Sequence, residues 1–124
     1  MSELRLLAGG YAVCGLAADA AIPEWAVGGS FVSLTRTRDE LSVVCAEDLV
    51  PAGTKCEGGW RVFQVAGPLE FSLTGVLAAI AAPLANAGVS IFAISTFDTD
   101  YVLVKEENLV KAVEALRGAG HRVA

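Results

Sequence analysis

Two polar stretches in the second half of the sequence have residue types suited to holding a small charged molecule. The first, residues 72–75, reads Ser-Leu-Thr-Gly, and Ser72 is suited to cap a helix that starts there. A helix N-terminus presents unpaired N–H groups and a partial positive charge, and Gly75 has no side chain to block an approaching carboxylate. The stretch therefore predicts an anion site, with the alternative that Gly75 only lets a neighbouring strand pack closely.

The second stretch, residues 95–100, brings hydroxyls, carboxylates and an aromatic ring together at the end of a predicted strand. Asp100 is suited to pair with an ammonium or guanidinium group, and Phe97 could cover an aliphatic chain. Helix amides and Asp100 together would complement the two opposite charges of an α-amino acid. The alternative is that Asp98 and Asp100 are turn residues that cap their own backbone and that Phe97 belongs to the core.

Residues for covalent chemistry or metal binding are few. His121 is the only histidine, and no Cys or Ser near it in the sequence completes a nucleophile pattern. The neighbouring Asp98 and Asp100 would be too well solvated on a turn to act as a separated acid and base. We therefore expect no enzyme activity, no metal and no cofactor.

The three cysteines, Cys14, Cys45 and Cys56, include no C-x-x-C pair. Neither a disulfide framework nor a zinc site is therefore indicated. Cys14 and Cys45 lie in apolar stretches, which favours small buried side chains that contribute to packing.

Length, composition and charge narrow the class of protein. A chain of 124 residues with 54% hydrophobic residues fits two small halves that share a core. A net charge of −5 with scattered Lys and Arg argues against nucleic acid as a partner. The longest apolar run, residues 73–85, contains Pro83 and is shorter than the roughly 18 residues that a membrane span needs. Glu3 and Arg5 interrupt any signal-peptide core, so we expect a cytoplasmic protein with no membrane partner.

The two polar stretches must be positioned by elements of the second half. A strand over residues 60–66 precedes a helical pattern over residues 72–87, in which Pro83 should kink or shorten the helix and Gly88 should end it. Strands over residues 90–96 and 101–104 follow, then a helix from Glu106 and a last strand over residues 121–123. The apolar face of that last helix consists of Leu109, Val110, Val113 and Leu116. The order βαββαβ predicts a ferredoxin-like antiparallel sheet with both helices on one face.

The first half repeats the second in reduced form. Residues 31–50 align with residues 91–110 at a constant offset of 60, and their apolar positions agree throughout the hairpin. Pro23 compresses the first helix of this repeat into residues 22–26, and Pro51 shortens its second helix. Residues 4–7 are predicted to add an extra strand at a sheet edge. We therefore divide the chain into a degenerate N-terminal repeat, residues 1–58, and a complete C-terminal repeat, residues 59–124.

Three segments of the sequence resemble the ACT domain family, notably the tandem ACT units of aspartate kinase regulatory domains and of CASTOR-type amino-acid sensors. The segments are residues 67–77 (GPLEFSLTGVL), the Pro83-Leu84 pair and residues 90–100 (SIFAISTFDTD), followed by a strand and the Glu106-Glu107 helix start. The likeness covers essentially the whole chain. It implies an α+β fold of two ferredoxin-like (βαββαβ) ACT repeats, the first with shortened helices, with antiparallel sheets and helices on one face.

The resemblance also implies a small-molecule effector, such as an amino acid, held by the first helix start of one ACT unit and the second strand of its partner. The ligand-binding residues that it implies are Thr74, Gly75, Val76, Ile91, Phe92, Thr96, Phe97 and Asp100. The implied role is that of a non-catalytic regulatory sensor, a homodimer that acts on a regulated protein partner. The alternative is a dimerisation and assembly module without a ligand.

Two departures from the family pattern limit these expectations. The chain has no kinase region. Where the second repeat has Thr96, Asp98 and Asp100, the first has Arg36, Arg38 and Glu40, so no equivalent ligand site is expected in the first repeat.

Overall fold

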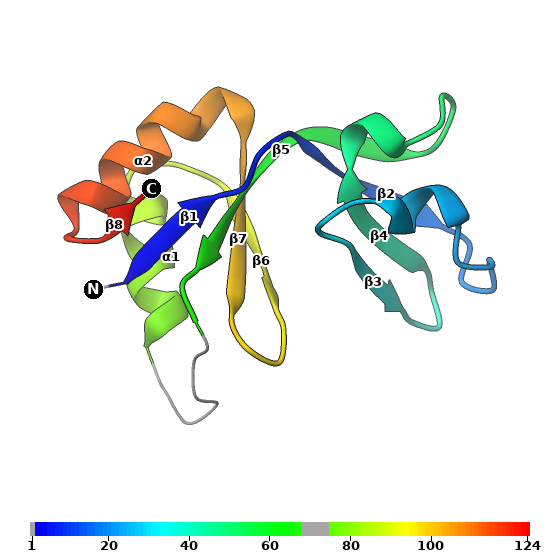
Figure 1. Ribbon diagram of the computed structural model, residues 1–124, viewed down its shortest axis with the longest axis horizontal. Coiled ribbons are helices and arrows are strands. Elements are labelled where there is room, and N and C mark those ends of the chain that lie inside the picture. Colours follow the sequence, from blue (N-terminus) through cyan, green and yellow to red (C-terminus); the bar gives the residue numbers. More distant parts are fainter. Residues whose placement is uncertain (1, 68–74) are drawn as a thin grey trace. The chain divides into compact units, whose positions relative to one another are not determined.

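A computed structural model describes residues 2–67 and 75–124 and divides the chain into two units (Figure 1). Unit 1 comprises Met1–Ala8 and Arg61–Ala124, and unit 2 comprises Gly9–Trp60. Strand β5 (Cys56–Val65) contributes its first half to unit 2 and its second half to unit 1. The predicted boundary at residue 58 therefore lies within a strand, because Cys56 and Glu57 already pair with β2.

Unit 2 has the strand order of a ferredoxin-like fold. Its strands are β2 (Tyr11–Leu16), β3 (Ser33–Arg36), β4 (Leu41–Ala46) and the first part of β5, and they lie in the order β3-β4-β2-β5 with antiparallel neighbours. The two helices of the motif are reduced to 3₁₀ turns, η1 (Glu24–Gly28) and η2 (Glu47–Leu49). This confirms the predicted shortening, since a proline stands just before η1 and another soon after η2.

The core of unit 2 lies on one face of its sheet. Its fully buried members alternate along β2 and β4 and pack against η1, and they are Ala12, Cys14, Ala26, Leu41, Val43 and Cys45. Tyr11 and Phe31 add an edge-to-face ring contact with centroids 5.7 Å apart.

Unit 1 contains a complete βαββαβ motif. After β5 come α1 (Val76–Asn86), β6 (Ile91–Ser95), β7 (Asp100–Lys105), η3 (Glu106–Asn108), α2 (Leu109–Gly118) and β8 (Arg122–Val123). Strand β7 lies between β5 and β6, as the ferredoxin-like motif requires.

Strand β1 (Glu3–Leu6) is an internal strand of the sheet of unit 1. It pairs antiparallel with β5 and parallel with β8, so the order is β8-β1-β5-β7-β6. The prediction that these residues add an edge strand is therefore wrong, and the first eight residues belong with the second repeat. The physical reason is Leu4, whose side chain is completely buried in the core of unit 1.

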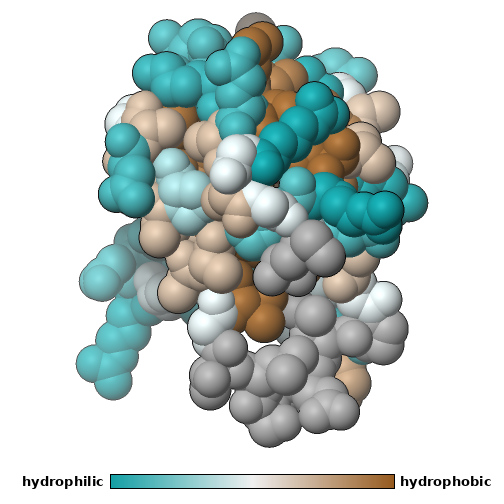
Figure 2. Space-filling model, turned by 90° about the vertical axis from the view of Figure 1, so that its left-hand side faces the viewer, coloured by the Kyte–Doolittle hydropathy of each residue, from teal (hydrophilic) through white to brown (hydrophobic). Residues whose placement is uncertain are grey.

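The helices of unit 1 cover one face of its sheet. Ile80 and Leu84 of α1 and Ala112 and Leu116 of α2 belong to the same buried cluster as the strand residues Leu4, Phe63, Val65, Val102 and Val104. Val110 was predicted on the buried face of α2 but is 72% exposed, because the buried face begins one residue earlier, with Leu109 against the core. On the face of unit 1 seen in Figure 2, hydrophilic and hydrophobic side chains are interspersed.

The C-terminal end of α1 is closed by a glycine. Gly88 has φ +75°, and the N–H of Val89 donates to the carbonyl of Leu84 at 2.9 Å, which closes the helix in the predicted glycine-based manner. Pro83 does not end the helix, which continues to Asn86.

None of the described helices is long and apolar enough to cross a lipid bilayer.

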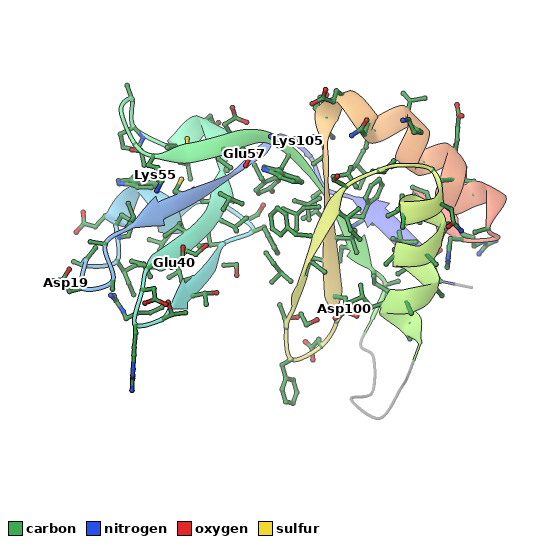
Figure 3. All side chains as sticks on the ribbon, turned by 180° about the vertical axis from the view of Figure 1, so that it is seen from behind. Asp19, Glu40, Lys55, Glu57, Asp100 and Lys105 are labelled. Carbon is green, nitrogen blue, oxygen red and sulfur yellow. The ribbon has the colours of Figure 1, made fainter. Side chains whose placement is uncertain are left out.

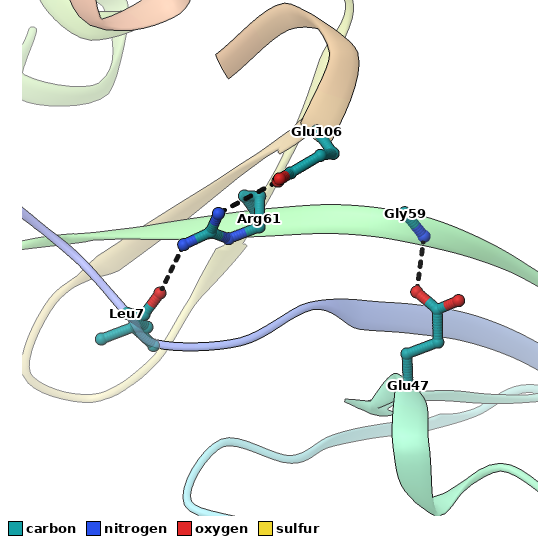
Figure 4. A network of polar contacts seen from close by, with 5 residues as sticks. All are labelled: Leu7, Glu47, Gly59, Arg61 and Glu106. Carbon is teal, nitrogen blue, oxygen red and sulfur yellow. Dashed lines mark hydrogen bonds and ion pairs between the residues drawn. The ribbon is translucent and has the colours of Figure 1, made fainter. Parts of the chain in front are cut away.

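In each unit, a glutamate in the 3₁₀ turn after β4 or β7 bonds to a residue of β5 (Figure 4). In unit 1, Glu106 Oε2 lies 3.0 Å from Arg61 Nη1, and Arg61 Nη2 also donates to the carbonyl of Leu7 at 3.4 Å. In unit 2, Glu47 Oε1 accepts a hydrogen bond from the N–H of Gly59 at 2.7 Å. These contacts anchor the turn in each unit to its own part of β5.

Candidate functional site

The start of α1 depends on a glycine for its backbone conformation. Gly75 is the N-cap, with φ +79°, and its carbonyl accepts the first helical bond from the N–H of Ala79 at 2.9 Å. Among the described residues, a Cβ at this position would meet nothing within 4 Å. No strand in the described part of the chain therefore packs closely against Gly75, as the alternative required. The predicted cap Ser72 and the predicted ligand residue Thr74 lie outside the described residues.

The β6–β7 turn lies at the same end of unit 1 as the start of α1 (Figure 1). The hydroxyl of Thr99, in the turn, donates to the carbonyl of Val65 at 2.7 Å, and Val65 is the last residue of β5. A Cβ on Gly67 would lie 3.0 Å from the Cβ of Thr99. This hydrogen bond fixes the turn against the end of β5.

The hydroxyls of Ser95 and Thr96 are engaged within the turn. The carbonyl of Thr99 accepts from the N–H of Thr96 at 2.8 Å and from its hydroxyl at 3.1 Å. The hydroxyl of Ser95 donates to Asp100 Oδ1 at 2.6 Å. The alternative of turn residues that cap their own backbone therefore describes Thr96 well, although that alternative was raised for the aspartates.

Asp100 and Phe97 are the two side chains of this turn that were predicted to contact a ligand's cationic group and aliphatic chain. Asp100 is half-buried at the first position of β7 (Figure 3), and its carboxylate is held by Ser95. The side chain of Phe97 is 79% exposed, so the alternative that it belongs to the core is wrong. An exposed ring and a fixed carboxylate in one turn are the groups that a cation with an apolar chain would need.

Other predicted site residues lie elsewhere in the unit. Ile91 pairs with Val104 at the far end of β6, roughly 13 Å along the strand from Ser95. Ile91 and Val76 pack against the core, whereas Phe92, the next residue of the strand, points to the opposite face. Within one copy of unit 1, Ile91 and Phe92 are therefore separated from the β6–β7 turn.

A hollow of about 400 Å³ in unit 1 was missed by the sequence reasoning. Its lining residues are Glu3, Leu4, Arg5, Gln64, Ala66, Gly67 and Ala124. Arg5 Nη2 donates to Gln64 Oε1 at 2.7 Å, and Gln64 Nε2 donates to the hydroxyl of Tyr101 at 3.3 Å. The hollow depends on β1 lying beside β5, and the only sequence signal was the polar alternation of Glu3 and Arg5 around the buried Leu4.

The candidate catalytic groups are occupied or not activated. The ring of His121 accepts the N–H of Ser2 at Nδ1, 3.0 Å away, and its Nε2 lies 2.9 Å from the carbonyl of Ala79. Burial, with smaller contributions from Cys45 and Cys56, raises the pKa of Cys14 from 9.0 to about 11, and burial also raises the pKa of Cys45. A raised pKa leaves only a small fraction of each thiol as the reactive thiolate at neutral pH. Among the described residues, no group of His, Cys, Asp or Glu is arranged to hold a metal ion.

Comparisons with known proteins point to a regulatory family. A model of the ACT domain matches residues 55–118, and a separate model of an N-terminal domain matches residues 9–53. The human cytosolic arginine sensor for mTORC1 subunit 1 is 42% identical over 59 residues, which are 47% of this chain and 18% of the sensor. The chain thus spans less than a fifth of the length of that relative.

Solved structures extend the likeness to the whole chain. A crystal structure of a protein from Agobacterium tumefaciens is 43% identical, with a TM-score of 0.94 over 99% of this chain and 92% of that one. The ligand-free regulatory subunit of aspartate kinase from Thermus thermophilus has the same fold at 13% identity, with a TM-score of 0.59 over 90% of this chain and 91% of that subunit. Because the ACT domain model covers more than half of the sequence, the chain belongs to the ACT domain family.

Proposed function

We propose that this protein is a non-catalytic regulatory sensor that binds an amino acid through unit 1. The observation that carries the proposal is the ACT domain match over residues 55–118, which includes nearly all of the complete βαββαβ motif. Further support comes from the relatives, which are an arginine sensor and a regulatory subunit of aspartate kinase. One relative is named as a sensor and the other as a regulatory subunit, so neither name assigns catalysis to the matching part.

In the proposed complex, the ligand carboxylate approaches the start of α1 at Gly75. The partial positive charge of the helix end supports this placement, and no atom of the described residues lies within 4 Å of where a Cβ on Gly75 would be. The ligand's cationic group pairs with Asp100, and Phe97 covers the aliphatic part. The hydrogen bond from Ser95 supports this role, because it fixes the carboxylate in one orientation.

Ile91 and Phe92 act on the ligand of a second copy in this proposal. They lie at the far end of β6 from the turn, so one copy cannot use them together with Asp100. Strand β6 forms an edge of the sheet of unit 1, where another chain can pair. The proposal therefore includes a homodimer, in which ligand binding in the cytoplasm shifts an equilibrium that a regulated protein partner senses.

The second candidate function is a ligand-free assembly module. The edge position of β6 favours it, because unpaired backbone groups on an edge strand support dimerisation without any ligand. A protein of this kind would associate in a concentration-dependent manner and would give flat titrations with every amino acid.

Thermal unfolding with single amino acids separates the two candidates. A ligand present at about 100 times its dissociation constant stabilises the folded state by roughly 2.7 kcal/mol, which raises the melting temperature measurably. We expect at least one amino acid to do so at millimolar concentration. A flat response across all amino acids, with intact dimer formation, would favour the assembly module.

Three substitutions locate the site. Asp100→Ala should remove the response to a cationic ligand, whereas Asp98→Ala, at an exposed position in the same turn, should retain it. Arg5→Ala tests the hollow, since Arg5 is its cationic group. Loss of the response in Arg5→Ala alone would move the site from the turn to the hollow.

A further inference from the structure

The three cysteines of unit 2 converge on one face of its sheet. Cys14 lies on β2, Cys45 on β4 and Cys56 on β5. Cys14 lies directly opposite Cys56 on β5, and Cys45 lies two positions beyond its partner on β4, although the residues are far apart in the sequence. The sequence reasoning assigned Cys14 and Cys45 to packing alone.

Cys14 and Cys56 face each other directly across β2 and β5. The N–H of Gly15 donates to the carbonyl of Lys55 at 3.0 Å, which makes Cys14 and Cys56 a non-hydrogen-bonded pair of the antiparallel ladder. Cα atoms in such pairs lie about 4.5 Å apart, and disulfides require roughly 4.4–6.8 Å. The pair can therefore be bridged without moving the strands.

Cys45 is placed less favourably for a bridge. Val43 is the residue opposite Cys14 on β4, so Cys45 is its diagonal neighbour, two positions further along. Diagonal neighbours in a sheet are separated by roughly 7–8 Å, beyond the usual span of a disulfide. The backbone register thus selects Cys56 as the partner of Cys14.

Exposure gives the two thiols different roles. Cys56 is exposed, beside the residues Lys55 and Glu57 labelled in Figure 3, whereas the side chains of Cys14 and Cys45 are completely buried. An oxidant in solution therefore reaches Cys56 first. Cys14 can then attack Cys56 from within the core, since the two residues face each other across β2 and β5.

We propose that Cys56 is a site of reversible thiol oxidation and that Cys14 resolves it to a cross-strand disulfide, with a hydroperoxide or a glutathione-type disulfide as the oxidant. With a hydroperoxide, the Cys56 thiolate attacks one peroxide oxygen, forms a sulfenic acid and releases hydroxide or an alkoxide. The Cys14 sulfur then displaces that oxygen as water, so two thiols lose two protons and two electrons to the peroxide. With a glutathione-type disulfide, the leaving groups are two glutathione thiols.

The second step should depend on pH. The reacting species is the Cys14 thiolate, and the pKa of this thiol is raised to about 11 by burial and by Cys45 and Cys56. Asp48 is the further charged group in this cluster, and it acts on Cys45. Below that pKa the thiolate fraction rises tenfold per pH unit, so the closure rate should rise about tenfold between pH 7 and pH 8.

The test is oxidation of the intact chain, followed by mapping of its thiols. The protein is incubated with hydrogen peroxide or oxidised glutathione, quenched in acid, alkylated under denaturing conditions and analysed by peptide mass spectrometry. We expect a mass loss of two hydrogens, a linked Cys14–Cys56 peptide pair, alkylation at Cys45 and reversal by dithiothreitol. A Cys45 linkage, a bridge between two chains through Cys56, or a stable adduct on Cys56 in the unaltered protein would overturn the proposal.

Single serine variants assign the roles. Cys45→Ser is the matched control and should close the disulfide as the unaltered protein does. Cys14→Ser should stop at a stable glutathione adduct on Cys56, and Cys56→Ser should form no disulfide. If a variant does not fold, which far-ultraviolet circular dichroism shows, the peptide map of the unaltered chain still decides the outcome.

Discussion

His121 donates a hydrogen bond from Nε2 to the backbone carbonyl of Ala79 over 2.9 Å, and Pro83, four residues further along the helix, cannot donate to that carbonyl. In an α-helix the N–H of residue 83 would bond to the carbonyl of residue 79, but proline has no N–H. The Ser2 N–H donates to Nδ1 of the same ring at 3.0 Å, which leaves the ring proton on Nε2. The histidine thus compensates for the proline and also attaches residue 2 to the core of unit 1.

Replacing His121 should destabilise the fold. His121→Ala leaves the Ala79 carbonyl and the Ser2 N–H without their partner, and we expect a loss of about 1–3 kcal/mol in the free energy of unfolding. Urea denaturation followed by circular dichroism measures this loss.

The same experiment in a Pro83→Ala background is the control. Alanine restores an N–H that can bond to the Ala79 carbonyl, so His121→Ala should cost about 1 kcal/mol less there than in the unaltered chain. Equal costs in both backgrounds would show that the histidine does not compensate for the proline.

Two glycines of unit 1 should respond differently to substitution. Gly75→Ala should cost about 1–2 kcal/mol because alanine disfavours a φ of +79°, and Gly75→Asn should recover part of that cost because asparagine tolerates this conformation. Gly67→Ala would place a Cβ 3.0 Å from Thr99 Cβ and 3.2 Å from the carbonyl of Asp98, so the larger Gly67→Asn should be worse.

Urea denaturation of the four glycine variants checks the contrast. Amide hydrogen exchange at Thr96 provides a second readout, because a displaced Thr99 would weaken the turn that protects this amide. If asparagine is no better than alanine at position 75, or is better than alanine at position 67, the explanation from backbone conformation and close contact fails.

Stability should fall in alkaline solution because of Cys14. Its pKa is 9.0 in the unfolded reference and about 11 in the folded state, so the unfolded chain releases the proton first as the pH rises. This contribution is complete below pH 9 and is lost progressively up to about pH 11, at about 1.4 kcal/mol per pH unit. Denaturant midpoints at pH 8, 9 and 10 measure the slope, which should be shallower in Cys14→Ala; an identical slope would exclude Cys14 as its cause.

The strands of the fold could be predicted from alternation and from the 60-residue repeat, but their neighbours could not all be predicted. The β6–β7 hairpin and its counterpart in the first repeat are local, so periodicity locates them. The place of β1 between β5 and β8 depends on contacts between segments far apart in the sequence. The local sequence around Leu4 does not indicate which strands it pairs with. Strand β5 begins before the predicted strand over residues 60–66 and continues through Gly58 and Gly59 with an irregular register against β2.

The candidate site was predictable as residue types but not as an arrangement. Asp100 and Gly75 were identified from chemistry, and Figure 1 shows the β6–β7 turn and the start of α1 at the same end of unit 1. Ile91 and Phe92 came from the family resemblance, and their distance from the turn follows from strand length. The hollow beside Arg5 was missed because it depends on the unforeseen pairing of β1.

The most direct test of amino-acid binding is a two-dimensional NMR titration with any amino acid that raises the melting temperature. The account predicts saturable shifts of the backbone amides of Gly75, Val76 and Asp100 in the unaltered protein, which disappear in Asp100→Ala and persist in Asp98→Ala. Shifts confined to Arg5 and Gln64, or a spectrum that no amino acid changes, would contradict it.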